Sequence, residues 1–319
     1  MNKVFTDGLS FALPLLIMAI GALYSEKSGV TNLAVEGFQG VGAFFGALAA
    51  TLLTPLIGSG NQAIIYIAMV CAAIGGALFS CIHGLLCIRF RANQVISGVV
   101  INILAVALTA FFTSVANTAI NGNASNKMVL DVSARFSVPL LSQIPWIGGL
   151  FTDMYPFEII IIVLVIILWY LMNRTRFGMR LRACGENPQA VDAAGANVVK
   201  IRWTAVIISG ALSGIAGICF AYSLLGSFSP TIYQGFGYLS IAAMIFGNWN
   251  IGTTTMACLV FGLAKAGGLQ LCIAMQRPVI YTDLFLMLPY VLTLLLLVFF
   301  SRKNHPPKAA GEPWDKSKR

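Results

Sequence analysis

The chain has 319 residues, of which 58% are hydrophobic and only 10% are charged, and its mean hydropathy is +0.85. A polar surface could not cover so much apolar material in water, so a soluble globular protein is excluded and a membrane protein is expected. The net charge of +9 comes from basic residues beside apolar segments, a pattern that encodes membrane topology and argues against nucleic-acid binding.

Apolar segments follow one another along the whole chain, and about nine of them approach the length of a membrane crossing. Segment 231–247 is short and rich in glycine, and segment 28–40 mixes polar with apolar residues. Either is a candidate broken or re-entrant helix, so the count ranges from about eight to ten. The expected spans lie near residues 8–24, 37–57, 63–87, 95–116, 157–172, 204–225, 231–247, 252–275 and 284–300.

Lysine and arginine are distributed unequally between the two sides that about nine crossings create. One side has only Lys3, Lys127, Arg135 and Arg277, whereas the other collects the remaining basic residues of the loops and the C-terminal tail. Because cytoplasmic loops carry the excess of positive charge, we expect an N-terminus outside and a cytoplasmic C-terminus. The predicted fold is an all-α polytopic transmembrane bundle over residues 1–300.

Polar residues near the second and fourth spans are candidates for a solute pathway. Asn32, Glu36 and Gln39 are four and three residues apart, so in a helix they would share one face. Polar groups inside a span usually face a cavity or a partner, which makes Glu36 the strongest candidate. The alternative is that Glu36 lies at the cytoplasmic interface and holds neighbouring helices together. Asn102, which enters the fourth span, is a further candidate.

Two loops are longer than a simple connection requires. Loop 117–156 is expected outside, where it caps the bundle, receives a partner, or is only a packed surface loop. Loop 173–203 is expected in the cytoplasm and contains a self-contained helix: Asn187 is its N-cap, Pro188 its first residue, and Gly195 the left-handed residue that ends it. This helix is typical of a docking element, although an amphipathic connector would share the same features.

The later spans carry three further signals. Gly210, Gly214 and Gly217 form a small-residue face that permits close helix packing in lipid. Segment 234–250 weakly echoes segment 36–51, either through duplication of a pathway-forming unit or through shared composition alone. Lys265 lies inside apolar sequence, where its charge is costly unless it pairs with an acid such as Glu36 or reaches water by snorkelling.

The tail, residues 301–319, is rich in proline and lysine and has few side chains to bury. It is therefore expected to be disordered, with an attraction for anionic membrane lipid at most.

Taken with these patterns, the sequence resembles the permease subunits of bacterial ABC importers, in the branch that serves simple sugars, nucleosides and branched-chain amino acids. The resemblance covers residues 7–300 and departs from the common pattern at Ala34 and Cys184, where glycine and an aliphatic residue are usual. The segment SGVTNLAVEG, residues 28–37, is more similar to the sugar and nucleoside members. The other anchors are RACGENP at 182–188, the Ala193-Ala194-Gly195 that follows, and SGALSGIAG at 209–217.

This resemblance implies that loop 185–200 is a coupling helix that docks on a cytoplasmic ATPase. The implied partners are two ATPases, a second and expectedly non-identical permease subunit, and an extracytoplasmic solute-binding protein. The chain has no GxxxxGK[ST] phosphate loop, so another polypeptide must supply the energy. The residues implied at the dock are Gly185, Glu186, Asn187, Pro188, Ala193, Ala194 and Gly195.

The expected function is import of a small polar solute by alternating access at the bacterial inner membrane, without cofactor, metal or covalent chemistry. The family likeness ranks a nucleoside first, a simple sugar second and a branched-chain amino acid third. One alternative is an ion-coupled secondary transporter or channel that uses Glu36 and Lys265. Another is an intramembrane enzyme, but one membrane histidine, His83, and no HExxH motif leave no assembled catalytic set.

Overall fold

The computed structural model describes residues 2–130, 135–137, 153–231, 235–275, 282–300 and 304–315, and its architecture is a bundle of long helices. Residues 131–134 and 138–152 of loop 117–156, together with Arg277 and both ends of the tail, lie outside the described residues. The described helices before loop 173–203 are α1 (Asn2–Lys27), α2 (Val35–Ile57), α3 (Gln62–Gly84), a π-helical turn η1 (Leu85–Arg89), α4 (Gln94–Asn121) and α5 (Pro156–Arg174).

The second half of the chain adds shorter elements between two long helices. The order is α6 (Arg176–Glu186), α7 (Pro188–Ala193), α8 (Val198–Phe220), a π-helical turn η4 (Ala221–Leu225), α9 (Phe236–Phe246), α10 (Ile251–Ala274), α11 (Thr282–Leu286) and α12 (Leu288–Phe300). The described strands are β1 (Met128–Val129) and β2 (Ser227–Phe228), which pair antiparallel with Met128 opposite Phe228.

Within the described part of the chain, seven helices are long and apolar enough to cross a membrane, and each overlaps a predicted span. The two remaining predicted spans, 231–247 and 284–300, correspond to shorter apolar helices. The all-helical prediction is therefore confirmed apart from the β1–β2 pair, and α9 is too short to cross by itself. At about 1.5 Å per residue, its 11 residues span about 16 Å, half of a bilayer core.

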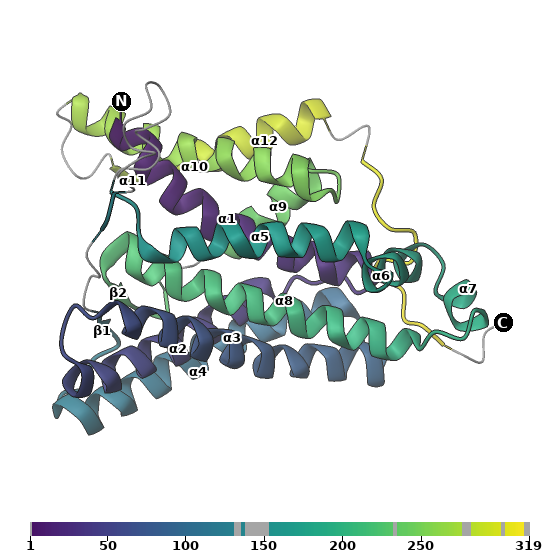
Figure 1. Cartoon of the computed structure of the whole chain (residues 1–319), viewed down its shortest axis with the longest axis horizontal. Helices are drawn as coiled ribbons and strands as arrows, with labels where there is room; N and C mark the ends of the chain where they lie inside the picture. Colours follow the sequence, from purple (N-terminus) through teal and green to yellow (C-terminus); the bar gives the residue numbers. More distant parts are fainter. Residues whose placement is uncertain are drawn as a thin grey trace.

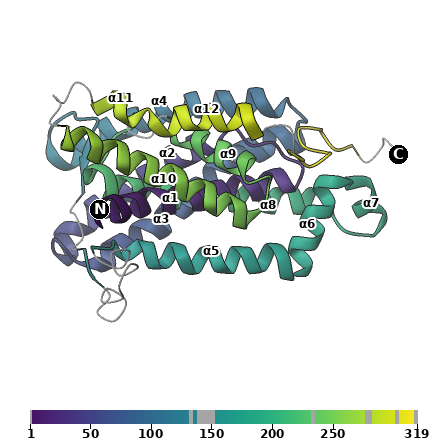
Figure 2. The ribbon, with the colours of Figure 1, turned by 90° about the horizontal axis from the view of Figure 1, so that it is seen from above.

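The bundle has two distinct ends. Figure 1 shows α6, α7 and the C-terminal segment at one end, which we call the α7 end, and β1 and β2 at the other, the β end. The most deeply buried span is α1, which packs against α8, α9 and α10. Figure 2 shows α5 along one edge of the bundle, where a large part of its surface is exposed. The buried centre thus belongs to α1 and α8, and the other spans surround them.

Close approach of α2, α3 and α8 depends on glycine. A Cβ added at Gly214 would lie 2.1 Å from the Ala72 carbonyl oxygen, and one at Gly210 would lie 2.5 Å from the Gly76 oxygen. A Cβ at Gly217 would lie 2.3 Å from the Gln39 oxygen. In lipid, where no hydrophobic force draws helices together, such backbone contact supplies the van der Waals energy of packing.

Candidate functional site

Loop 173–203 forms two helices, α6 and α7, at the α7 end. In α7 the side chain of Asn187 accepts a hydrogen bond from the Ala190 N–H at 3.0 Å, and Pro188 occupies the first turn. The helix ends at Ala193, and Gly195 follows with φ of +81° while its N–H donates to the Asp192 oxygen at 2.9 Å. The cap, the proline and the left-handed glycine thus all lie at the predicted positions.

The predicted dock residues fall into two groups, buried and accessible. Val191 anchors α7 with 6% exposure, and Gly185 is buried, because a Cβ there would lie 2.4 Å from the Lys27 oxygen. Burial also raises the pKa of the neighbouring Cys184 thiol, against the opposing effect of the Arg202 guanidinium. The accessible members are Glu186, Asn187, Ala193, Ala194 and Gly195, with Pro188 half-buried. These accessible residues form a small exposed knob in which Glu186 is the one charged member.

The C-terminal segment lies beside this loop. Residues 304–315 of the tail, which we call the strap, run across the α7 end. The Ala309 N–H donates to the Gly185 oxygen at 2.8 Å, Arg202 donates to the Glu312 oxygen at 3.0 Å, and Arg91 binds Asp315 at 2.7 Å. Two of these three contacts are hydrogen bonds to backbone groups of the strap. Such contacts cannot be predicted from amino-acid composition.

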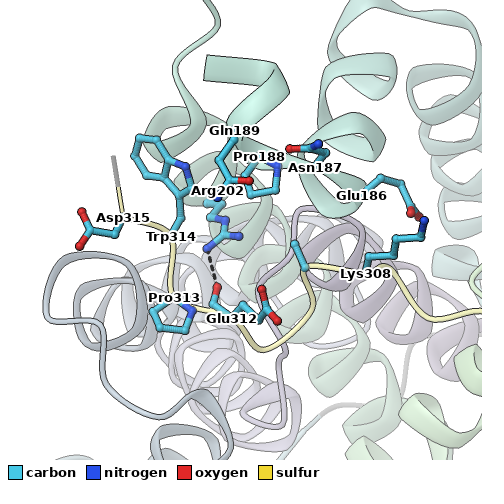
Figure 3. Close-up of a pocket in the computed structure, with 11 residues that line it drawn as sticks. Glu186, Asn187, Pro188, Gln189, Arg202, Lys308, Glu312, Pro313, Trp314 and Asp315 are labelled. Carbon is cyan, nitrogen blue, oxygen red and sulfur yellow. Dashed lines mark hydrogen bonds between the residues drawn. The ribbon is translucent and has the colours of Figure 1, made fainter. Parts of the chain in front are cut away.

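A cavity of about 460 Å³ separates part of the strap from the α6–α7 turn. Figure 3 shows Glu186, Pro188 and Gln189 on one side of it and Lys308 and Trp314 of the strap on the other. Arg202 lies between the two sides with 2% exposure. The strap is therefore held at separate points and leaves open space beside α7.

Three of the predicted pathway residues, Asn32, Glu36 and Asn102, lie near one another inside the bundle. Asn32 donates to the Ser209 hydroxyl at 2.9 Å, and Ser209 is the central residue of α8. Asn32 is not helical, because α2 begins at Val35, so the helical face predicted for Asn32, Glu36 and Gln39 is wrong in its first member. The α1–α2 connection thus extends into the bundle as far as the central residue of α8 before α2 begins.

The first turn of α9 lies against the first turn of α2. Both carboxylate oxygens of Glu36 lie 3.0 Å from the Gly235 N–H, which precedes α9 and has no side-chain cap of its own. A Cβ on Gly237 would lie 2.5 Å from the Glu36 Cβ, so only glycine permits this approach. Because helix N-termini carry exposed N–H groups and partial positive charge, a carboxylate shared between two of them is stabilised.

Asn102 completes this α2–α9 junction from α4. Its Oδ1 accepts from the Gly37 N–H at 2.8 Å, and its Nδ2 donates to the Leu33 oxygen at 2.8 Å and to the Tyr238 hydroxyl at 3.2 Å. Tyr238 is 47% exposed and Glu36 half-buried, and a Cβ at Gly40 would meet open space. The junction therefore has an accessible polar and aromatic face close to the level of the central residue of α8.

The other two predicted pathway residues lie apart from this face. Gln39 is fully buried, with neither side-chain polar atom hydrogen bonded. Lys265 lies with its Nζ 3.8 Å from the Phe11 ring centre and 4.1 Å from that of Phe236, the first residue of α9. Within the described part of the chain Lys265 and Glu36 form no ion pair, so the predicted pairing of these two residues is wrong. The partners of the Lys265 ammonium are instead the ring faces of Phe11 and Phe236.

Sequence reasoning missed the residues that complete these sites. Ser209 and Gly235 contact the junction from segments far away in the chain, and the weak echo between segments 36–51 and 234–250 was the one signal that paired α2 with α9. Glu158, in the first turn of α5, is 1% exposed and accepts a 2.6 Å hydrogen bond from Ser10.

Comparison with known proteins places these features in a family. The family model described as "Branched-chain amino acid transport system / permease component" matches residues 4–297. The chain is 37% identical to the nucleoside ABC transporter permease protein NupC of Lactococcus lactis subsp. cremoris (strain MG1363), over 99% of this chain and 97% of that protein.

Two further relatives extend the comparison. The chain is 36% identical to the guanosine ABC transporter permease protein NupQ of Bacillus subtilis (strain 168), over 98% of this chain and 96% of that protein. It is 24% identical to the glucose ABC transporter permease protein TsgB13 of Haloferax volcanii, over 93% of this chain and 77% of that protein. No solved structure matches the chain.

Proposed function

The chain belongs to this ABC permease family and is a multi-pass transport subunit rather than an enzyme, and on that premise we propose that it imports a nucleoside. The observation that carries the choice of solute is its similarity, over nearly the full length, to permeases named for nucleosides and guanosine. A simple sugar is the second candidate, supported by the more distant similarity to a glucose permease.

The proposed transport complex contains this chain, a second and non-identical permease subunit, two ATPases and an extracytoplasmic solute-binding protein in a bacterial plasma membrane. Helix α7 and its flanking residues, from Gly185 to Gly195, dock on an ATPase. The exposed knob at the α7 end supports this role, because it projects beyond the spans and presents no large apolar surface to water. The family membership favours ATP-driven import over an ion-coupled secondary transporter.

The proposed solute pathway follows the accessible face of the α2–α9 junction, in contact with Glu36 and Asn102. A polar face at mid-depth is costly against lipid, which supports its being covered by the second permease subunit with an aqueous path between them. Tyr238 offers a ring on which a nucleobase can stack while the Glu36 carboxylate accepts hydrogen bonds from the solute. Broken helices that meet at the midplane are a recurring architecture of such sites.

Uptake by the reconstituted complex tests this function. Proteoliposomes that contain the permease pair and the ATPases, supplied with the binding protein, are expected to accumulate radiolabelled guanosine or inosine only when ATP is present on the ATPase side. Excess unlabelled nucleoside should compete, whereas glucose and leucine should not. Uptake driven by an ion gradient without ATP would contradict the proposal, and competition by glucose alone would move the solute to the sugar class.

Cysteine labelling in intact cells tests the proposed orientation, with the β end outside and the α7 end in the cytoplasm. A cysteine at Lys127 is expected to react with an impermeant maleimide added to intact cells. Cysteines at Arg180 and Ala310 are expected to react only after the cells are permeabilised. Cys71 and Cys81, the native cysteines that are not buried, should first be replaced by serine. Labelling of positions 127 and 180 from the same side would exclude this topology.

A further inference from the structure

The strap connects the proposed ATPase dock to the connection that leads into the membrane. The Ala309 N–H binds the Gly185 oxygen at 2.8 Å, and the Ala309 carbonyl oxygen lies 3.2 Å from the position of a Cβ at Gly29. Ala309 itself is 5% exposed, so it is enclosed between the end of α6 and the α1–α2 connection. One residue of the strap therefore contacts both segments.

Arg202 reinforces the same contact from α8. Its guanidinium donates to the Glu312 oxygen at 3.0 Å, and its Nη2 lies 2.7 Å from the position of a Cβ at Gly29. With φ of +89° and the guanidinium this close, position 29 admits no side chain. Strap, Arg202 and the α1–α2 connection are thus in mutual contact.

The α1–α2 connection then leads directly to the junction. The Thr31 N–H donates to the Gln94 side-chain oxygen at 2.6 Å, Asn32 binds Ser209, and α2 begins at Val35, next to Glu36. By contrast α7 packs mainly on α6, and the cavity of about 460 Å³ lies between the α6–α7 turn and the end of the strap. Movement of α7 has a continuous contact route to Glu36 through Gly185, Ala309 and Gly29.

We propose that the strap is a positioning element of the transport cycle, which transmits displacement of the dock to the α1–α2 connection and hence to the α2–α9 junction. This inference rests on the proposed function of the dock. The strap contacts neither solute nor nucleotide in this scheme. It sets how much of the ATPase movement reaches the pathway.

Two truncations in the reconstituted complex separate this role from simple assembly. A chain that ends after Lys303 lacks the strap, and a control chain that ends after Asp315 keeps it. Both are expected to bind the ATPase and to support ATP hydrolysis, but the strapless chain should import at least about fivefold less solute per ATP hydrolysed, the lower end of typical coupling between sites. Ala309→Pro, which removes the donor to Gly185 and fixes the backbone angle φ of residue 309, leaves the rest of the strap in the chain and should change the ratio in the same direction.

Three results would overturn the inference. An unchanged ratio of solute to ATP in the strapless chain would show that the strap is passive. Loss of ATPase binding would make it part of the dock instead of a link. If the strapless chain fails to insert, Ala309→Pro decides, and a normal ratio in that variant contradicts the role. Failure of the proposed function is distinguishable, because the control chain would then show no ATP-dependent uptake.

Discussion

Gly195→Val is expected to abolish stable association with the ATPase while the membrane bundle remains assembled. Gly195 has φ of +81°, and a left-handed backbone costs an L-residue about 1–2 kcal/mol, with a β-branched residue at the upper end. A Cβ at Gly195 would meet no atom within 4 Å, so the strain acts on the end of α7 and not on the spans. Because a six-residue helix has little stability of its own, most of the dock should lose its shape.

The measurement is co-purification of the ATPase in detergent, together with uptake in vesicles, at matched membrane levels of each variant. Gly122→Val is a matched control, because Gly122 ends α4 at the β end with φ of +70° and equally open surroundings. Asn187→Ala should give an intermediate loss, since it removes one cap worth about 1 kcal/mol. Normal ATPase binding and uptake in Gly195→Val would reduce the loop to a connector.

The helix α7 was predictable because the residues that determine its two ends are close together in the sequence. Asn187, Pro188 and Gly195 fix its two ends by hydrogen bonds and backbone angles that involve residues within a few positions of one another. The long apolar spans were predictable for the related reason that length and composition decide whether a helix can cross a bilayer. The strap shows the converse. Its ties to Gly185 and Arg202 use backbone groups that every sequence possesses.

The junction was predictable only in part. Asn32, Glu36 and Asn102 were identified because polar residues inside apolar sequence are costly, but their partners depend on the tertiary fold. Helical spacing placed Asn32 on α2, whereas its hydrogen bond to Ser209 holds it in the connection. Opposite charge suggested Glu36 for Lys265, whereas the fold brings Phe11 and Phe236 to the ammonium. Periodicity cannot detect contacts between residues that are far apart in the chain.

Glu36→Gln is expected to reduce solute uptake by about ten- to a hundredfold, because a charge-assisted hydrogen bond is worth about 1.5–3 kcal/mol and the amide keeps the shape but not the charge. The Gln side chain can still accept from the Gly235 N–H, so α9 should stay in place. The substitution removes the negative charge that stabilises the two facing helix N-termini, and it also weakens the hydrogen-bond acceptor that the solute uses.

Two readouts distinguish this pathway effect from loss of the dock. In Glu36→Gln the ATPase should still co-purify, unlike in Gly195→Val, and only uptake should fall. Asp153→Asn, at an exposed carboxylate on the β end, is the control for loss of one acidic group; Glu158 is unsuitable because its carboxylate is buried on Ser10. Uptake by Glu36→Gln equal to that of Asp153→Asn would make Glu36 a packing residue. A lower uptake in Glu36→Gln than in Asp153→Asn would therefore place the solute beside the half-buried Glu36 carboxylate, where α2 and α9 begin.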